Sequence, residues 1–247
     1  MMKEELGDVL WYIATLASRH NISLEHIAKF NIKKNRSRWV PVDPSNDKSS
    51  RLLDERFPVR AQLPRKFMVR FTHTKGKLIV SDERGKKIGD PLTDNNYFDD
   101  GYRFHDIMHF AFSAVLGWSP VARKLFKRKR PKLITGQKFD EDAEDGGRAK
   151  VLDEAIVALC YNYWKRKKFS LSIKSIDYEL LRSIKQLTDH LEVEVCVFSE
   201  WERAILKGYQ VWNSLRSNSG GWVIGNMNAR DISYSGDSAR LPRLNAL

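Results

Sequence analysis

One stretch near the start decides how the chain begins to fold: Glu4-Glu5-Leu6-Gly7-Asp8-Val9-Leu10-Trp11-Tyr12-Ile13. Glu5 and Asp8 are three residues apart, so on a helix their carboxylates share one face. Behind these acids, apolar residues recur at helical spacing, at Val9, Leu10, Tyr12, Ile13, Leu16 and Ala17. This pattern predicts a helix that packs in a bundle.

Two carboxylates on one helical face suit Mg²⁺, which takes oxygen ligands and keeps positions open for substrate phosphates. The alternative is that these acids only stabilise the positive end of the helix dipole, which is the commoner role of acids in a first helical turn. The spacing of Glu5 and Asp8 alone favours the dipole explanation.

The same stretch resembles the third helix of the MazG-type nucleoside triphosphate pyrophosphohydrolases, an all-α family that cleaves nucleotides. That family carries an E-x-x-E pair on one helix and an E-x-x-D pair on the next, and Glu5 with Asp8 match the second pair. Its last helix often reads N-x-x-K followed by R, which Asn31, Lys34 and Arg38 match. The resemblance implies that these three residues contact the nucleotide's phosphates. It also implies conversion of a nucleoside triphosphate into a monophosphate and pyrophosphate with Mg²⁺, or alternatively Mn²⁺.

The helix that carries the family's first E-x-x-E pair would precede Met1. We therefore expect an N-terminally short copy with half of the metal shell, in which the activity is incomplete. Residues 1–40 are expected to be a partial MazG-like helical region whose two helices leave an apolar stripe to be covered. A homodimer is the simplest way to cover it, and a separately encoded helical pair is another.

The composition is that of a globular protein, because 42% of the 247 residues are hydrophobic. No apolar run approaches the roughly 20 residues that cross a bilayer. The start also lacks the order of a signal peptide, so we expect a cytoplasmic protein without a membrane partner. The formal net charge of +12 favours anionic partners, whether nucleotides, nucleic acid or acidic proteins.

The rest of the chain predicts a mainly helical α+β fold with a small antiparallel β-hairpin or sheet. Residues 41–64 are expected to form a linker, because Pro41, Pro44, Ser45 and Asn46 break the helical pattern. Residues 65–217 are expected to form a larger helical domain that begins with the hairpin. Its helices are predicted over 102–116, 148–167, 177–191 and 199–215. Residues 218–247 lack periodicity and are expected to be a mobile tail.

A second cluster of chemistry lies on the apolar helix 102–116, at His105, Asp106 and His109. The two histidines are four residues apart, so one helical face presents both rings to a single transition metal ion. Asp153 and Glu154, early in the next long helix, are candidates for a third ligand. The alternative, which is slightly favoured, is that buried histidines bond to carboxylates and only fix helix packing.

Three further stretches resemble the C-terminal extension of some bacterial MazG-like proteins, an extension that implies no particular activity. They are Asp-Gly-Tyr-Arg-Phe-His-Asp at 100–106, Leu-Gly-Trp-Ser-Pro at 116–120 and Glu-Asp-Gly-Gly-Arg-Ala at 144–149. Together with the N-terminal match, they make a MazG-like nucleotide pyrophosphohydrolase the leading hypothesis.

Two other hypotheses stay open. One is a metal-dependent hydrolase centred on His105, Asp106, His109 and Glu154, with the N-terminus as a dimerisation arm. The other is a non-enzymatic module whose basic run 123–132 binds nucleic acid or an acidic partner. For that run we favour a solvated helix end neutralised by the acidic loop 140–145, because no aromatic platform accompanies it.

Overall fold

The computed structural model describes residues 2–39, 52–93, 96–130, 133–134, 137–138 and 141–236. The chain divides into two compact units, Met1–Pro41 and Val42–Leu247. The described helices include none that is both long and apolar enough to cross a membrane.

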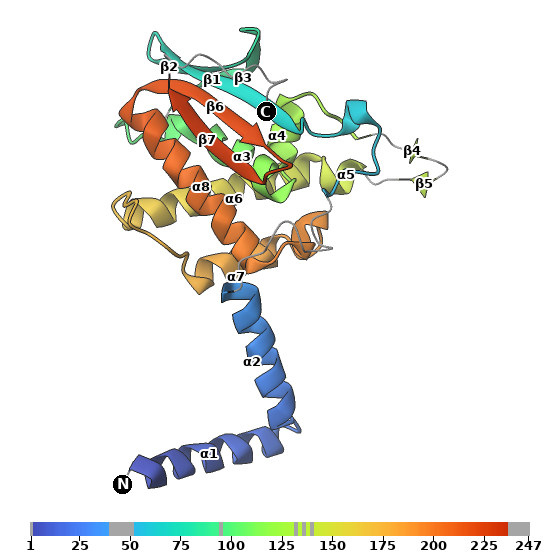
Figure 1. The fold of residues 1–247 in the computed structure, drawn as a ribbon, viewed down its shortest axis with the longest axis vertical. Helices are drawn as coiled ribbons and strands as arrows, with labels where there is room; N and C mark the ends of the chain where they lie inside the picture. The colour runs from blue at the N-terminus through green and yellow to red at the C-terminus, as the bar shows by residue number, and fades with distance from the viewer. Residues whose placement is uncertain are drawn as a thin grey trace. The chain divides into compact units, whose positions relative to one another are not determined.

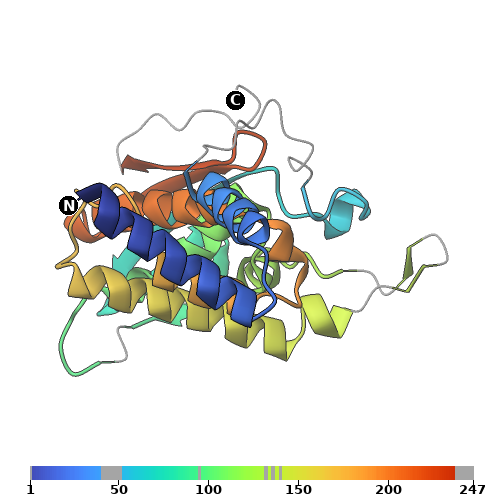
Figure 2. The same ribbon diagram turned by 90° about the horizontal axis from the view of Figure 1, so that it is seen from below.

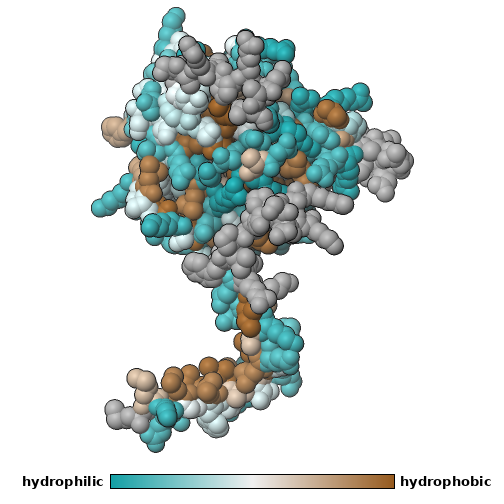
Figure 3. Space-filling model, in the orientation of Figure 1, coloured by the Kyte–Doolittle hydropathy of each residue, from teal (hydrophilic) through white to brown (hydrophobic). Residues whose placement is uncertain are grey.

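The first unit consists of two helices, α1 (Met2–Arg19) and α2 (Leu24–Trp39), as the periodicity predicts. Ser23 precedes α2 and its hydroxyl accepts a hydrogen bond from the backbone N–H of His26, at 3.3 Å. The apolar residues of α1 are exposed, and Figure 3 shows them as a hydrophobic band along the helix. They are Leu6, Val9, Leu10, Trp11, Tyr12, Ile13 and Leu16. Such a stripe is typical of a helix that packs against another apolar surface.

A five-stranded antiparallel sheet runs through the second unit in the order β3-β2-β1-β6-β7 (Figure 1). Its strands are β1 (Lys66–Thr74), β2 (Lys77–Asp82), β3 (Lys87–Leu92), β6 (Gly220–Asn226) and β7 (Asp231–Gly236). The predicted hairpin is β1 and β2, in which Phe71 lies opposite Val80. The second unit therefore does not have the all-α architecture of the family that the N-terminal stretch resembles.

The prediction of a mobile tail from residue 218 is wrong for 220–236, because β6 pairs with β1 at the centre of the sheet. The glycines that suggested a loop make room for aromatic rings instead. A Cβ atom added to Gly225 would lie 2.1 Å from the ring of Phe67, and one added to Gly221 would lie 2.6 Å from the ring of Tyr234. Glycine in a strand often marks such a close approach.

The expected linker also needs correction, since residues 52–64 pack into the second unit. Phe57 and Leu63 are buried, and the buried Asp54 accepts hydrogen bonds from the backbone N–H of Leu63 and from Arg65. Residues 40–51, where the predicted break lies, are outside the described part of the chain.

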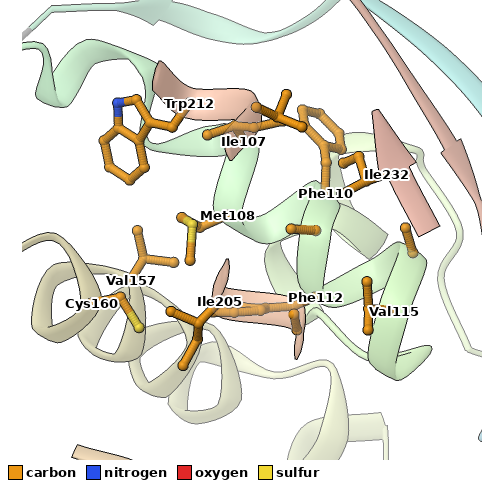
Figure 4. Close-up of a cluster of buried hydrophobic side chains, with 14 of the residues drawn as sticks. Ile107, Met108, Phe110, Phe112, Val115, Val157, Cys160, Ile205, Trp212 and Ile232 are labelled. Carbon is orange, nitrogen blue, oxygen red and sulfur yellow. The ribbon is translucent and has the colours of Figure 1, made fainter. Parts of the chain in front are cut away.

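Helix α3 (Asp106–Leu116) is buried along its whole length, as expected for a helix that is apolar on all sides. In Figure 4, Phe110 points toward Ile232 of β7, whereas Met108 points toward Val157 and Cys160 of the neighbouring helix. The helix therefore lies between the sheet and a second helical layer. It ends at Gly117, whose φ of 74° is the left-handed conformation that glycine adopts without strain.

That second layer contains α6 (Gly147–Arg166) and α7 (Tyr178–Leu187), while α8 (Phe198–Ser217) packs on α3 and the sheet. Helix α6, the long yellow helix of Figure 2, packs against α3, α4 and α7. Shorter elements complete the unit: α4 (Pro120–Leu125), α5 (Glu141–Glu144), β4 (Leu133–Ile134), β5 (Gln137–Lys138) and single 3₁₀ turns at Val59–Ala61, Tyr102–Phe104 and Glu192–Val195.

Candidate metal centre

The N-terminal end of α3 and the second turn of α6 bring His105, His109 and Glu154 together. In the described part of the chain, their ligand atoms form a group of three in which all atoms lie within 4.8 Å of one another. His109 Nε2 lies 3.3 Å from Glu154 Oε2, and His105 Nε2 lies 4.0 Å from the same oxygen. Asp106 Oδ1 is 3.5 Å from His105 Nε2. The spacing of the two histidines on one helix produces this geometry, as the sequence predicts.

Asp153 stands behind the group and holds one of its histidines. Its Oδ1 accepts a hydrogen bond from Nδ1 of His109 at 2.9 Å, and both side chains are fully buried. Its Oδ2 accepts bonds from the hydroxyl of Ser119 at 2.6 Å and from the backbone N–H of Val121 at 3.0 Å. Because α4 begins at these residues, one carboxylate fixes both the ring of His109 and the start of α4.

His105 is oriented by the backbone before α3. Its Nδ1 lies 3.0 Å from the carbonyl oxygen of Tyr102. A carbonyl oxygen accepts hydrogen bonds and cannot donate them, so Nδ1 of His105 carries the proton. The ring also stacks on that of Tyr102, with centroids 4.7 Å apart and planes at 10°. In the neutral ring, Nε2 then keeps its lone pair, and this atom lies 3.5 Å from Asp106 Oδ1 and 4.0 Å from Glu154 Oε2.

The electrostatics of the group reflect its carboxylates. Burial opposes the charged form of His109, but the charge and hydrogen bond of Asp153, with a smaller contribution from Glu154, raise its pKa to about 10. Burial raises the pKa of Asp106 although the two histidines oppose that shift. Burial would also raise the pKa of Glu154, but the hydrogen bond from His109 and nearby positive charges lower it. Without a metal ion, the cluster therefore favours a protonated His109 between two carboxylates.

The predicted N-terminal site residues lie in the first unit. Glu5 and Asp8 are exposed on α1, and Asn31 is exposed on α2. Lys34 and Arg38 lie within α2, but their side chains are outside the described part. Among the described residues, no third His, Cys, Asp or Glu side chain joins Glu5 and Asp8 in a group that could hold a metal ion.

Some residues of the basic run 123–132 form buried ion pairs, and others line a cavity. Arg123 and Arg130 are buried and pair with Asp145, with closest distances of 3.3 and 3.0 Å. The expected neutralisation by the acidic loop is therefore observed at Asp145, although these arginines are buried and not solvated. Other basic residues surround a cavity of about 270 Å³, which is lined by Pro120, Arg123, Lys124, Lys127, Arg128, Lys129, Asp145 and Lys150.

Sequence reasoning identified Glu154 as a candidate third ligand but missed three contributors. Tyr102 and Ser119 act through a backbone carbonyl and a hydroxyl, which no motif marks. The sequence predicts Asp153 as a candidate ligand, whereas the structure places it behind His109, where it forms a bond of the kind expected in the alternative in which buried histidines bond to carboxylates. Its position directly before Glu154 was the available signal, since adjacent helical residues point about 100° apart.

Comparison with protein families gives two matches. Residues 1–41 match the MazG nucleotide pyrophosphohydrolase domain, and residues 48–238 match the MazG C-terminal domain. Searches of curated proteins and of solved structures found no match. The second match covers most of the chain and contains the whole histidine cluster, whereas the first contains Glu5 and Asp8. The chain therefore belongs to the MazG family, with a match to its pyrophosphohydrolase domain followed by its C-terminal domain.

Proposed function

We propose that the chain acts as a Mg²⁺-dependent nucleoside triphosphate pyrophosphohydrolase that releases a nucleoside monophosphate and pyrophosphate. The match of residues 1–41 to the pyrophosphohydrolase domain carries this proposal. Glu5 and Asp8 support it because they occupy one face of α1 and are open to solvent, as ligands of a hydrated metal–nucleotide complex must be.

Each predicted residue has a chemical role in this proposal. Glu5 and Asp8 hold Mg²⁺, which when bound neutralises phosphate charge and lowers the pKa of water. Lys34 and Arg38 would bind the phosphates through charge-assisted hydrogen bonds, and the amide of Asn31 would orient them. These three residues are spaced three and four positions apart in the sequence, which is the spacing of neighbours along a helix.

The exposed apolar stripe of α1 supports a site that is shared between segments. We infer that a second copy of the chain, or another helical pair, covers this stripe and adds carboxylates to Glu5 and Asp8. A homodimer would place two Glu5–Asp8 pairs in one bundle. Apolar side chains such as Trp11 and Tyr12, both more than half exposed, would lose their contact with water there.

The test is pyrophosphate release from a panel of nucleoside triphosphates in the presence of Mg²⁺. We expect Glu5→Gln and Asp8→Asn each to lower the rate at least about 100-fold, because each removes a charged ligand. Glu25→Gln is the matched control, since Glu25 is an exposed acid on α2 that pairs only with Lys29 in the described contacts. If Glu5→Gln releases pyrophosphate as fast as Glu25→Gln does, the assigned site is wrong.

A further inference from the structure

We propose that His105, His109 and Glu154 bind one divalent transition metal ion, and that the adjoining basic cavity holds a phosphate group of the ligand. The proposal concerns the second unit alone. It stands independently of the pyrophosphohydrolase function proposed for residues 1–41.

The first argument is the orientation of the two imidazole rings. Nδ1 of His105 donates to the carbonyl of Tyr102, and Nδ1 of His109 donates to the carboxylate of Asp153. The Nε2 atoms of both rings lie within 4.0 Å of the same oxygen of Glu154. Metal-binding histidines almost always carry such a partner on the second ring nitrogen, because it fixes the tautomer and orients the ring. In this cluster, both histidines have such a hydrogen-bond partner on Nδ1.

The distances between the candidate ligand atoms also fit a bound metal ion. Metal–ligand bonds of about 2.1 Å in a tetrahedron place neighbouring ligand atoms about 3.4 Å apart. The separation between Nε2 of His109 and Oε2 of Glu154 is 3.3 Å, and that between Nε2 of His105 and the same oxygen is 4.0 Å. Glu154 is half exposed, so its side chain is able to move by a few tenths of an ångström. Asp106 Oδ1 lies 3.5 Å from His105 Nε2 but does not join the group of three whose ligand atoms all lie within 4.8 Å of one another.

The donor set indicates the kind of metal ion. Two imidazole nitrogens and a carboxylate oxygen suit Zn²⁺, Co²⁺ or Fe²⁺ better than Mg²⁺ or Ca²⁺, which prefer oxygen ligands alone. The same side chains also form a stable arrangement without a metal, in which a protonated His109 lies between Asp153 and Glu154. A direct measurement of metal binding distinguishes the metal-bound cluster from this metal-free arrangement.

The basic cavity adjoins the candidate metal centre. Lys150 lies four residues before Glu154 on α6, so both side chains project from one face of that helix. Lys124 of α4 also lines the cavity. Pro120 connects the two sites, since it lines the cavity and directly precedes Val121, which bonds to Asp153. A cavity of about 270 Å³ with several lysines and arginines suits an oxyanion such as phosphate.

The first experiment measures metal binding to the full-length chain. Protein treated with a chelator is titrated with Co²⁺, followed by calorimetry and by visible absorption, which reports tetrahedral coordination. We expect one tight Co²⁺ site per chain, weakened at least about 10-fold by Glu154→Gln and by His105→Ala. Glu179→Gln, which alters an exposed acid on α7, is the control and should bind Co²⁺ as the wild type does.

Circular dichroism keeps this test separate from folding. Glu154 and His105 are not fully buried, so both variants should retain the wild-type spectrum. A chain that binds no Co²⁺, or a folded Glu154→Gln chain that binds it as tightly as Glu179→Gln, would overturn the metal centre.

The second experiment adds inorganic phosphate to the Co²⁺-loaded protein. A phosphate bound beside the paramagnetic ion should show a broadened ³¹P resonance. Lys150→Ala should weaken phosphate binding about tenfold, the equivalent of one charge-assisted hydrogen bond, without changing Co²⁺ affinity. Lys174→Ala, which removes an exposed lysine elsewhere, is the control. Equal phosphate affinity in Lys150→Ala and Lys174→Ala would overturn the phosphate site and leave the metal centre standing.

Discussion

Replacement of Asp54 by alanine should destabilise the second unit strongly, because its carboxylate joins three parts of the chain. Asp54 is fully buried. Its oxygens accept hydrogen bonds from the backbone N–H of Leu63 at 2.6 Å, from Arg65 at 2.6 Å and from the buried Arg123 at 3.3 Å. These contacts hold residues 52–65 against α4, which forms a wall of the basic cavity.

The size of this destabilisation depends on the polar groups that lose their partner in Asp54→Ala. The N–H of Leu63 loses its partner inside the protein, which costs about 1–3 kcal/mol. Arg123 loses one of its two carboxylates but keeps Asp145 at 3.3 Å, so its loss falls below the 3–5 kcal/mol of a fully broken buried pair, at about 2–3 kcal/mol. The two contributions together give an expected loss of about 3–6 kcal/mol. Asp54→Asn retains one oxygen as acceptor and should lose about half as much.

Urea denaturation followed by near-ultraviolet circular dichroism measures this loss in the second unit. Trp118, Trp164, Trp201 and Trp212 are fully buried there and dominate the signal, whereas Trp11 of the first unit is exposed. Asp189→Ala, which removes an exposed carboxylate, should change the free energy of unfolding by less than about 0.5 kcal/mol. A loss below about 1 kcal/mol in Asp54→Ala would refute the role given to this carboxylate.

Three more predictions concern pH, packing and assembly. Burial and the charge of Glu192 raise the pKa of Glu144 from 4.5 to about 7, so the native state binds this proton more tightly and loses stability as pH rises between those values. Because Glu144 is only half-buried, we expect a loss of about 1–2 kcal/mol, which urea titrations at pH 5 and pH 8 should find in the wild type and not in Glu144→Gln. Gly225→Val should cost about 1–3 kcal/mol in the same urea assay, because its side chain would overlap Phe67, and a neutral effect would contradict the observed contact. Trp11→Glu should lower the molar mass measured by light scattering, since it places a charge in the apolar stripe of α1; an unchanged mass would exclude assembly through that stripe.

Local signals were sufficient for the longer helices and for the first hairpin, but not for the short helices α4 and α5, the second of which lies in the expected acidic loop. The apolar run 102–116 and the stop at Gly117 predicted α3, which is observed as Asp106–Leu116 after a single 3₁₀ turn. Strands β6 and β7 were missed because Gly220, Gly221 and Gly225 look like loop residues in the sequence. Only the rings packed against two of them, from Phe67 and Tyr234, explain why glycine is needed there.

The candidate site was predictable where one helix carries it and unpredictable where tertiary contacts build it. The spacing of His105 and His109 placed both rings on one face, and the structure adds Glu154 to them. Apart from the position of Asp153 directly before Glu154, the sequence contained no sign that Asp153 would orient His109. Residues 44 positions apart meet only because α3 packs on α6. For the same reason, the sequence did not show that Arg123 is buried and not solvated like the rest of a surface basic run.

The most direct test of the proposed function is the identity of the products formed from a nucleoside triphosphate. Wild-type chain is incubated with the triphosphate in the presence and absence of Mg²⁺, and the products are resolved by ³¹P NMR. We predict a nucleoside monophosphate and pyrophosphate in equal amounts, formed only when Mg²⁺ is present. Formation of a nucleoside diphosphate and free phosphate, or no Mg²⁺-dependent turnover of any nucleoside triphosphate, would contradict the proposed function.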